Sequence, residues 1–185
     1  GMWYSTASNI TGTLLSSATP NGQASALTVF SLDANTTYYL RVGSIWGPTT
    51  SYAPTPAYSS STLAGAVAGV ELQSVYETSA TLSWNALPAT PQTATSEGYI
   101  VQTSTKADFT GTVLSSATLN VALSTLTVAG LARDTTYYFR VGSLNHMSLA
   151  HYVQAGSTVT LPGAPGAAAL TSVELSSVTA NWTAN

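Results

Sequence analysis

The side chains that could carry acid–base or metal chemistry are few and scattered along this chain. Its 185 residues include seven acidic residues, two histidines and no cysteine. General acid–base catalysis needs two titrating groups held about one substrate, and the sequence pattern places no two of these carboxylates in a shared cleft. The two histidines, His146 and His151, lack the further ligands that a zinc site normally gathers. We therefore expect no catalytic residue, no cofactor and no metal.

Nucleophilic and nucleotide chemistry lack their usual motifs as well. The sequence has no Gly-x-Ser-x-Gly, no P-loop and no dinucleotide fingerprint, and its many serines and threonines have no adjacent base to activate them. Four basic against seven acidic residues give a net charge of −3, which provides no cationic stripe for phosphates or anionic lipids. No apolar run approaches the roughly 18 residues of a membrane span, and the first residues lack a signal-peptide layout. These features predict no enzyme, no nucleic-acid partner and no membrane insertion.

The elements that must position any functional residue follow an internal repeat. Residues 131–141 (Leu-Ala-Arg-Asp-Thr-Thr-Tyr-Tyr-Phe-Arg-Val) nearly copy residues 32–42 (Leu-Asp-Ala-Asn-Thr-Thr-Tyr-Tyr-Leu-Arg-Val), a spacing of 99 (131 minus 32). A second match relates residues 80–84 to residues 178–182, a spacing of 98 (182 minus 84). A period of this length is too long for a solenoid unit and indicates whole domains in tandem.

Hydrophobic alternation within one period predicts β-strands. Tyr137, Phe139 and Val141 fall on one face of their segment, which is the period of a half-buried strand. A Pro-rich loop is expected over 85–98. The same pattern predicts further strands, which in the letters of a β-sandwich are A at 70–75, B at 80–84, C from 99, C′ at 112–116, E at 126–128, F after the turn at 132–136, and G at 157–161.

The repeated segment resembles the corner between strands E and F of a fibronectin type III domain. In that corner a leucine, a polar turn and a tyrosine precede alternating apolar residues, and the tyrosine hydroxyl ties the turn to the backbone. Trp84 late in strand B and Tyr99 at the start of strand C extend the resemblance across the module. It is strongest for bacterial extracellular tandem versions, whose corners often read Asn-Thr-Thr-Tyr-Tyr, as residues 35–39 do here.

The resemblance implies an all-β fold of tandem fibronectin type III-like (immunoglobulin-like) β-sandwiches on an extracellular or cell-surface protein. It transfers no site residues, because the family's Arg-Gly-Asp motif is absent from the F to G loops. We expect Asn35 and Asp134 to form Asx turns at the two corners. Trp84 and Trp182 are expected to anchor cores.

The repeat is out of phase with the ends of the sequence. Residues 1–63 (the head) match strands C to G, residues 64–161 (the middle module) match a complete repeat, and residues 162–185 (the tail) match strands A and B of a further repeat. The head lacks one layer and the tail lacks the other, and leaving their apolar faces wet would forfeit several kcal/mol at about 25 cal/mol per Å². The faces expected to be exposed carry Leu27, Val29, Tyr38, Leu40 and Val42 in the head, and Val173, Val178, Ala180 and Trp182 in the tail.

Because the missing and surplus strands are complementary, we predict self-association by donor-strand exchange. The tail of one chain would supply strands A and B to the head of another. Reciprocal exchange would close a dimer, and one-way exchange would make a filament. The sequence leaves these two assemblies open.

Exposed aromatic residues and histidines of the F to G regions form the candidate binding surface. Loops at the end of a sandwich often carry recognition, and aromatic rings can stack on sugars or anchor protein partners. The alternative, which we favour, is that these rings cover joints between repeats or strand edges. The candidate residues are Trp46, Tyr52, Tyr58, His146, His151 and Tyr152, with both histidines expected on the middle F to G loop.

Two functional hypotheses follow. The first is a non-catalytic structural or adhesive repeat module of a secreted or cell-surface bacterial protein that assembles by strand exchange. The alternative is a carbohydrate-binding or spacer accessory region of a larger polysaccharide-degrading enzyme. Trp46, Tyr52 and Tyr152 would then form the sugar platform.

Overall fold

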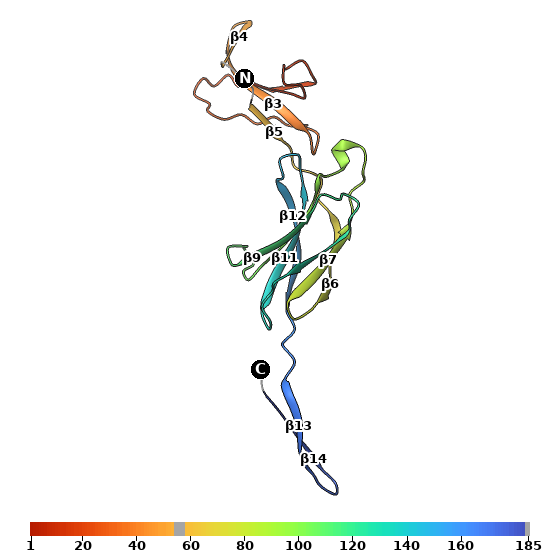
Figure 1. Cartoon of the computed structure of the whole chain (residues 1–185). Helices are drawn as coiled ribbons and strands as arrows, with labels where there is room; N and C mark the ends of the chain where they lie inside the picture. Colours follow the sequence, from red (N-terminus) through yellow and green to blue (C-terminus); the bar gives the residue numbers. More distant parts are fainter. Residues whose placement is uncertain (54–57, 184–185) are drawn as a thin grey trace.

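The computed structural model describes residues 1–53 and 58–183, and it is elongated, with the head at one end and the tail at the other (Figure 1). The head contains β1 (Met2–Ser5), β2 (Leu14–Ser17), β3 (Thr37–Trp46), β4 (Thr49–Tyr52) and β5 (Tyr58–Ser61). The middle module contains β6 (Ala68–Val75), β7 (Ser79–Asn85), the 3₁₀ turn η1 (Gln92–Ala94), β8 (Gly98–Ser104), β9 (Val113–Thr118), β10 (Thr125–Ala129), β11 (Thr136–Leu144) and β12 (Ala150–Val159). The tail contains β13 (Gly166–Val173) and β14 (Val178–Thr183).

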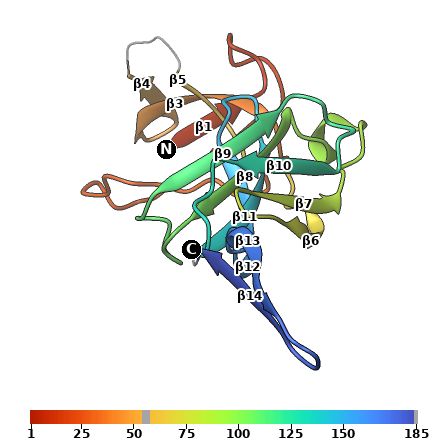
Figure 2. The same ribbon diagram turned by 60° about the horizontal axis from the view of Figure 1, so that its bottom comes forward.

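Two antiparallel sheets pack face to face in the middle module. One sheet has the strand order β10-β7-β6, and the other has the order β12-β11-β8-β9. Figure 2 shows both sets of strands in the middle module. Leu82 and Trp84 from β7 meet Val101, Phe139 and Val141 from the opposite sheet in one buried cluster. This architecture confirms the expected all-β sandwich fold, because each sheet buries its alternating apolar face against the other. Trp84 is buried, as expected of a core anchor.

The tyrosine corner that the sequence predicts is present in both copies. The backbone N–H of Ala132 donates to the hydroxyl of Tyr137 at 3.0 Å. In the head, the N–H of Asp33 donates to the hydroxyl of Tyr38 at 2.9 Å. Each corner therefore satisfies a turn amide that would otherwise lack a protein partner.

The residues expected to form Asx turns at these corners act through their backbone instead. Asn35 and Asp134 have φ angles of 45° and 48°, a left-handed conformation that Asn and Asp adopt more readily than other non-glycine residues. The Asn35 side chain turns away from its own corner, and its amide donates to the Glu97 carboxylate at 3.1 Å. The expectation of Asx turns was therefore wrong.

Two predicted strands differ from the structure. Strand G runs over Ala150–Val159 as β12 and not over 157–161, and it pairs with β11 along its whole length with a bulge between Phe139 and Arg140. The polar residues His151 and Gln154 interrupt its apolar alternation, which hid the strand in the sequence. In the head, the described residues 24–33 form no strand where strand E was expected. The equivalent strand β10 pairs with β7, and the head has no counterpart of β7 to pair with.

The head is one layer of a sandwich. Its strands have the order β2-β1-β3-β4, with β5 also paired to β3. Tyr38 is buried, contrary to expectation, because its own corner folds over its hydroxyl. Val42 is 49% exposed, whereas Val141 at the matching position of the middle module is fully buried. The layer that would cover this end of the head is absent from it.

The tail is a two-stranded hairpin, β13 with β14, that projects away from the middle module (Figure 1). Trp182, expected to be a core anchor, is 62% exposed, whereas its counterpart Trp84 is 3% exposed. A lone hairpin has no second layer to bury its apolar side chains, which explains the difference. Within the described residues there is no helix with the length and apolar character needed to cross a bilayer.

We predict that Tyr137→Phe destabilises the middle module by about 1–3 kcal/mol, because the Ala132 amide loses its acceptor. Urea unfolding followed by tryptophan fluorescence measures the change. Tyr138→Phe is the matched control, since Tyr138 is the next residue and lies half-buried on the opposite face. Equal unfolding midpoints for the two variants would contradict the role assigned to the corner.

Candidate interaction surfaces

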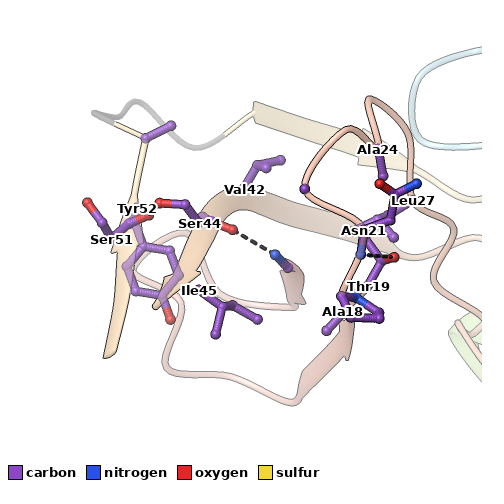
Figure 3. Close-up of a pocket in the computed structure, with 15 residues that line it drawn as sticks. Ala18, Thr19, Asn21, Ala24, Leu27, Val42, Ser44, Ile45, Ser51 and Tyr52 are labelled. Carbon is purple, nitrogen blue, oxygen red and sulfur yellow. Dashed lines mark hydrogen bonds between the residues drawn. The ribbon is translucent and has the colours of Figure 1, made fainter. Parts of the chain in front are cut away.

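A hollow of about 860 Å³ lies along β3 in the head. Figure 3 shows β3 running between β4, which carries Ser51 and Tyr52, and the loop that carries Asn21, Ala24 and Leu27. Val42 and Leu27 are two of its apolar lining residues. The residues that match them, Val141 and Leu126, belong to or pack against the buried core of the middle module. The hollow therefore includes apolar surface whose counterpart in the middle module is covered by the sheet that contains β6 and β7.

The tail hairpin reproduces the β6–β7 hairpin of the middle module residue for residue. Adding 98 to each β6–β7 pair gives the β13–β14 pairs, including the two places where the register shifts. For example, Leu72 pairs with Leu82, and Leu170 pairs with Ala180. The turns also agree, since Tyr76 N donates to Ser79 O and Glu174 N donates to Ser177 O, each at 2.8 Å. The tail hairpin thus has the same backbone pairing as the β6–β7 hairpin.

Hydrogen bonds join the head to the middle module through the turn between β11 and β12. The buried Asn145 amide donates to the carbonyls of Ser61 and Thr62, both at 3.1 Å. The Asn145 carbonyl oxygen accepts from Met147 N and Leu149 N, both at 2.9 Å, which fixes the turn that presents it. One side chain therefore closes the turn and holds the last strand of the head.

Further contacts extend this joint. The Ser143 hydroxyl donates to Gly65 O at 2.6 Å, and His151 Nδ1 lies 2.8 Å from Ala64 O. The linker residues Ala64 and Val67 are buried. The linker is thereby held along its length by the middle module, so we expect the two parts to move as one stiff unit.

Of the two histidines only His151 contacts the linker, and only His146 lies in the loop where the sequence placed them. His146 lies in the β11–β12 turn, with Nδ1 3.3 Å from Glu97 Oε1 and Nε2 3.0 Å from the Gln92 amide nitrogen. His151 lies within β12, which corrects its expected loop position. Among residues 1–53 and 58–183, no three His, Asp or Glu side chains are grouped to hold a metal. The His151 contact belongs to the joint, and the His146 contacts lie within the middle module.

Tyr152 and Tyr52 occupy equivalent places beside arginines. Tyr152 lies in β12, not in the loop region where it was expected, and its ring lies 3.8 Å from the Arg140 guanidinium carbon. In the head, Tyr52 lies 3.6 Å from the same atom of Arg41 and packs edge-on against Trp3. Such stacking stabilises a sheet face, and it engages rings that were candidates for sugar binding.

Trp46 and Tyr58 are the freely exposed members of the candidate set, at 85% and 76%. Trp46 ends β3 at the pole of the head far from the middle module, and Tyr58 begins β5. The six candidate residues are therefore distributed over both ends of the head, the joint and the outer face of β12, and do not form one surface. Asn145 could not be singled out from the sequence, because the matching residue of the first copy is Trp46 and the repeat gives no sign of a shared role.

One carboxylate has a shifted acidity, and its cause is structural. The Thr110 hydroxyl and backbone N–H both donate to Asp108 Oδ1, at 2.7 and 3.0 Å, and they hold the pKa of Asp108 below its ordinary value. At the matching turn of the head, Asn9 accepts the same two bonds from Thr11. Since an amide replaces the acid in the repeat, the charge of Asp108 is not needed for what this turn does.

We predict that Asn145→Ala loosens the joint and exposes the linker. Thermolysin cleavage between residues 62 and 67 should then rise about tenfold, which corresponds to about 1.4 kcal/mol of lost protection. Asn120→Ala is the control, because Asn120 makes a similar bond to its own turn, at Ala122 N, away from the joint. Equal linker cleavage in the two variants would show that Asn145 does not hold the head.

Comparison with known proteins agrees with this fold. Residues 65–156 match the family model of the fibronectin type III domain. No curated protein matches the chain.

Several solved structures resemble it. A segment of two fibronectin type III domains from chicken tenascin is 20% identical, covers 86% of this chain and 82% of its own, and has a TM-score of 0.46. The fibronectin type III domain of the human collagen alpha-1(XX) chain is 21% identical, with 54% of this chain and 89% of its own covered and a TM-score of 0.42. The FN5 domain of Drosophila Lar is 20% identical, with coverages of 55% and 100% and a TM-score of 0.37. The chain is thus an all-β protein whose residues 65–156 match the fibronectin type III domain in sequence and have its sandwich fold.

Proposed function

We propose that this chain is a non-catalytic structural or adhesive module of a secreted or cell-surface bacterial protein, and that it associates with itself by strand exchange. The tail hairpin of one chain, β13–β14, would lie on the open face of another chain's head. The single observation that carries the proposal is the residue-for-residue agreement between the β13–β14 and β6–β7 registers. A hairpin already shaped as strands A and B needs little further ordering when it docks, which lowers the cost of binding.

The middle module gives the expected docking register. In it, β10 pairs with β7, and Thr127 lies opposite Thr81 with their hydroxyl oxygens 2.8 Å apart. Applying the repeat spacings of 99 and 98 places Thr28 of the head opposite Thr179 of the incoming tail. The head segment around Thr28 would then pair with β14 of the incoming tail, as β10 pairs with β7, and would itself become a strand.

Burial of apolar side chains supplies the driving force. Leu170, Val173, Val178 and Trp182 are exposed in the free tail, and covering them would contribute roughly 6–12 kcal/mol at about 1.5–3 kcal/mol each. Association itself costs about 4–15 kcal/mol. These opposing free energies are of similar size, so we expect weak association, with a Kd no tighter than about micromolar.

The carbohydrate-binding alternative has less support. Its proposed platform residues lie on two different modules, and two of the three rings, Tyr52 and Tyr152, are stacked beside arginines. A sugar platform needs rings that are free and near one another. The joint, with its hydrogen-bonded linker, favours a spacer that holds neighbouring modules at a fixed angle.

The first test is sedimentation of the 185-residue chain and of a variant lacking residues 162–185, from about 1 μM, the tightest Kd expected, up to about 1 mM. We predict that the mass of the full chain rises with concentration and that the mass of the shortened chain does not. The control is Trp182→Ser in the full chain, which should weaken association without removing the hairpin. A full chain that stays monomeric at every concentration would contradict the proposed strand exchange.

The second test uses the absence of native cysteine. Thr28→Cys combined with Thr179→Cys should form a disulfide between chains, because cross-strand neighbours have the separation that a disulfide needs. Thr28→Cys with Thr110→Cys is the matched control, since Thr110 lies on an exposed turn of the middle module. Equal yields from the two pairs under oxidation would argue against the docking register.

A further inference from the structure

The β3–β4 turn of the head occupies the place of the β11–β12 turn of the middle module. Trp46 pairs with Thr49 at the end of β3, and Asn145 bonds to Leu149 at the end of β11. The repeat spacing of 99 matches Trp46 with Asn145. In the middle module this position holds the last strand of the preceding part of the chain. In the head it is the most exposed of the candidate binding residues.

A matching surface exists at the other end of the molecule. The repeat spacing of 98 relates Ser61, which Asn145 holds, to Val159 at the end of β12. Ser61 is buried beneath the β11–β12 turn, whereas Val159 and Leu161 are about half exposed. Pro162 follows and is exposed as well. These apolar residues lie where the middle module passes into the tail, and Pro162 is four residues before the start of β13 at Gly166.

We infer that Trp46 of one chain packs against residues 159–162 of the chain whose tail it receives, so that successive chains join in line as an open head-to-tail filament. The inference rests on the proposed strand exchange. Once β13–β14 lies on a head, the short link from Pro162 to Gly166 holds the donor's residues 159–162 at the pole of that head. Trp46 lies at this same pole. At this joint the apolar Trp46 ring would meet the apolar residues of segment 159–162. At the head-to-middle joint the corresponding contact is between the Asn145 amide and the carbonyls of Ser61 and Thr62.

The direction of growth follows from the shape of the chain. The head and the tail lie at opposite ends of an elongated molecule, with the middle module between them (Figure 1). If each new joint continues the line as the head-to-middle joint does, a chain's own head stays far from the head that receives its tail. Reciprocal exchange would require four rod-like modules to bend into a ring. A head-to-tail contact that does not close produces a filament.

The test is a second cysteine pair, Trp46→Cys with Val159→Cys, in the full chain. Both side chains are well exposed, so we expect both substitutions to leave the fold intact, which far-UV circular dichroism checks. Mild oxidation of associated chains should give a ladder of dimers, trimers and longer species on a non-reducing gel. Cross-linking should be about a hundredfold faster than for freely diffusing thiols, because the docked tail raises their effective concentration to the millimolar range. Trp46→Cys with Ser115→Cys is the control pair, since Ser115 is an exposed residue of β9.

The possible outcomes distinguish the Trp46 contact and the filament from the strand exchange on which both depend. A ladder specific to the Trp46–Val159 pair supports the joint and the filament. Disulfide-linked dimers alone would overturn the filament and leave strand exchange standing as a closed pair. Association in sedimentation with no more cross-linking than the control pair would overturn the Trp46 contact while strand exchange stands. A full chain that does not associate would overturn both.

Discussion

The apolar face of one sheet has to be covered by another, and the structure depends on whether that cover is present. In the middle module, Leu82 and Trp84 of one sheet bury Val101, Phe139 and Val141 of the other. With this contact in place β10 finds β7 as a partner and the core closes. The head has the same sequence pattern in its F strand but no second sheet. Its segment 24–33 forms no strand, and Val42 stays half exposed.

Local features of the repeat survive without that cover. The tyrosine corner forms around Tyr38 as it does around Tyr137, because its hydrogen bond spans five residues and needs no second sheet. The A–B hairpin forms in the tail for the same reason, since its pairing is between neighbours in sequence. What the head and the tail each lack is a second sheet packed against their apolar face. The tyrosine corner of the head and the hairpin of the tail therefore form within one chain, as the proposed strand exchange requires.

How much the sequence could predict depended on the range of each interaction. The repeat, the alternation of Tyr137, Phe139 and Val141 and the E to F corner were sufficient for the fold. Strand β12 was predicted too short, because polar residues on its surface hide the alternation. The joint was not predicted, since Asn145 acts on the carbonyls of Ser61 and Thr62, more than eighty residues away, and backbone acceptors leave no mark in the sequence. Tyr152 and Tyr52 were candidates for a binding surface, and their arginine partners become visible only when the strands are paired.

The most direct test of the central claim is amide hydrogen exchange of the intact chain at low and high concentration. If the tail of one chain completes the head of another, the amides of residues 26–30 and 178–183 gain protection together as concentration rises. The amides of β7 and β10 in the middle module, which already pair within the chain, stay unchanged. Protection at residues 26–30 and 178–183 that is the same at every concentration would contradict strand exchange and leave the head and tail as independent pieces.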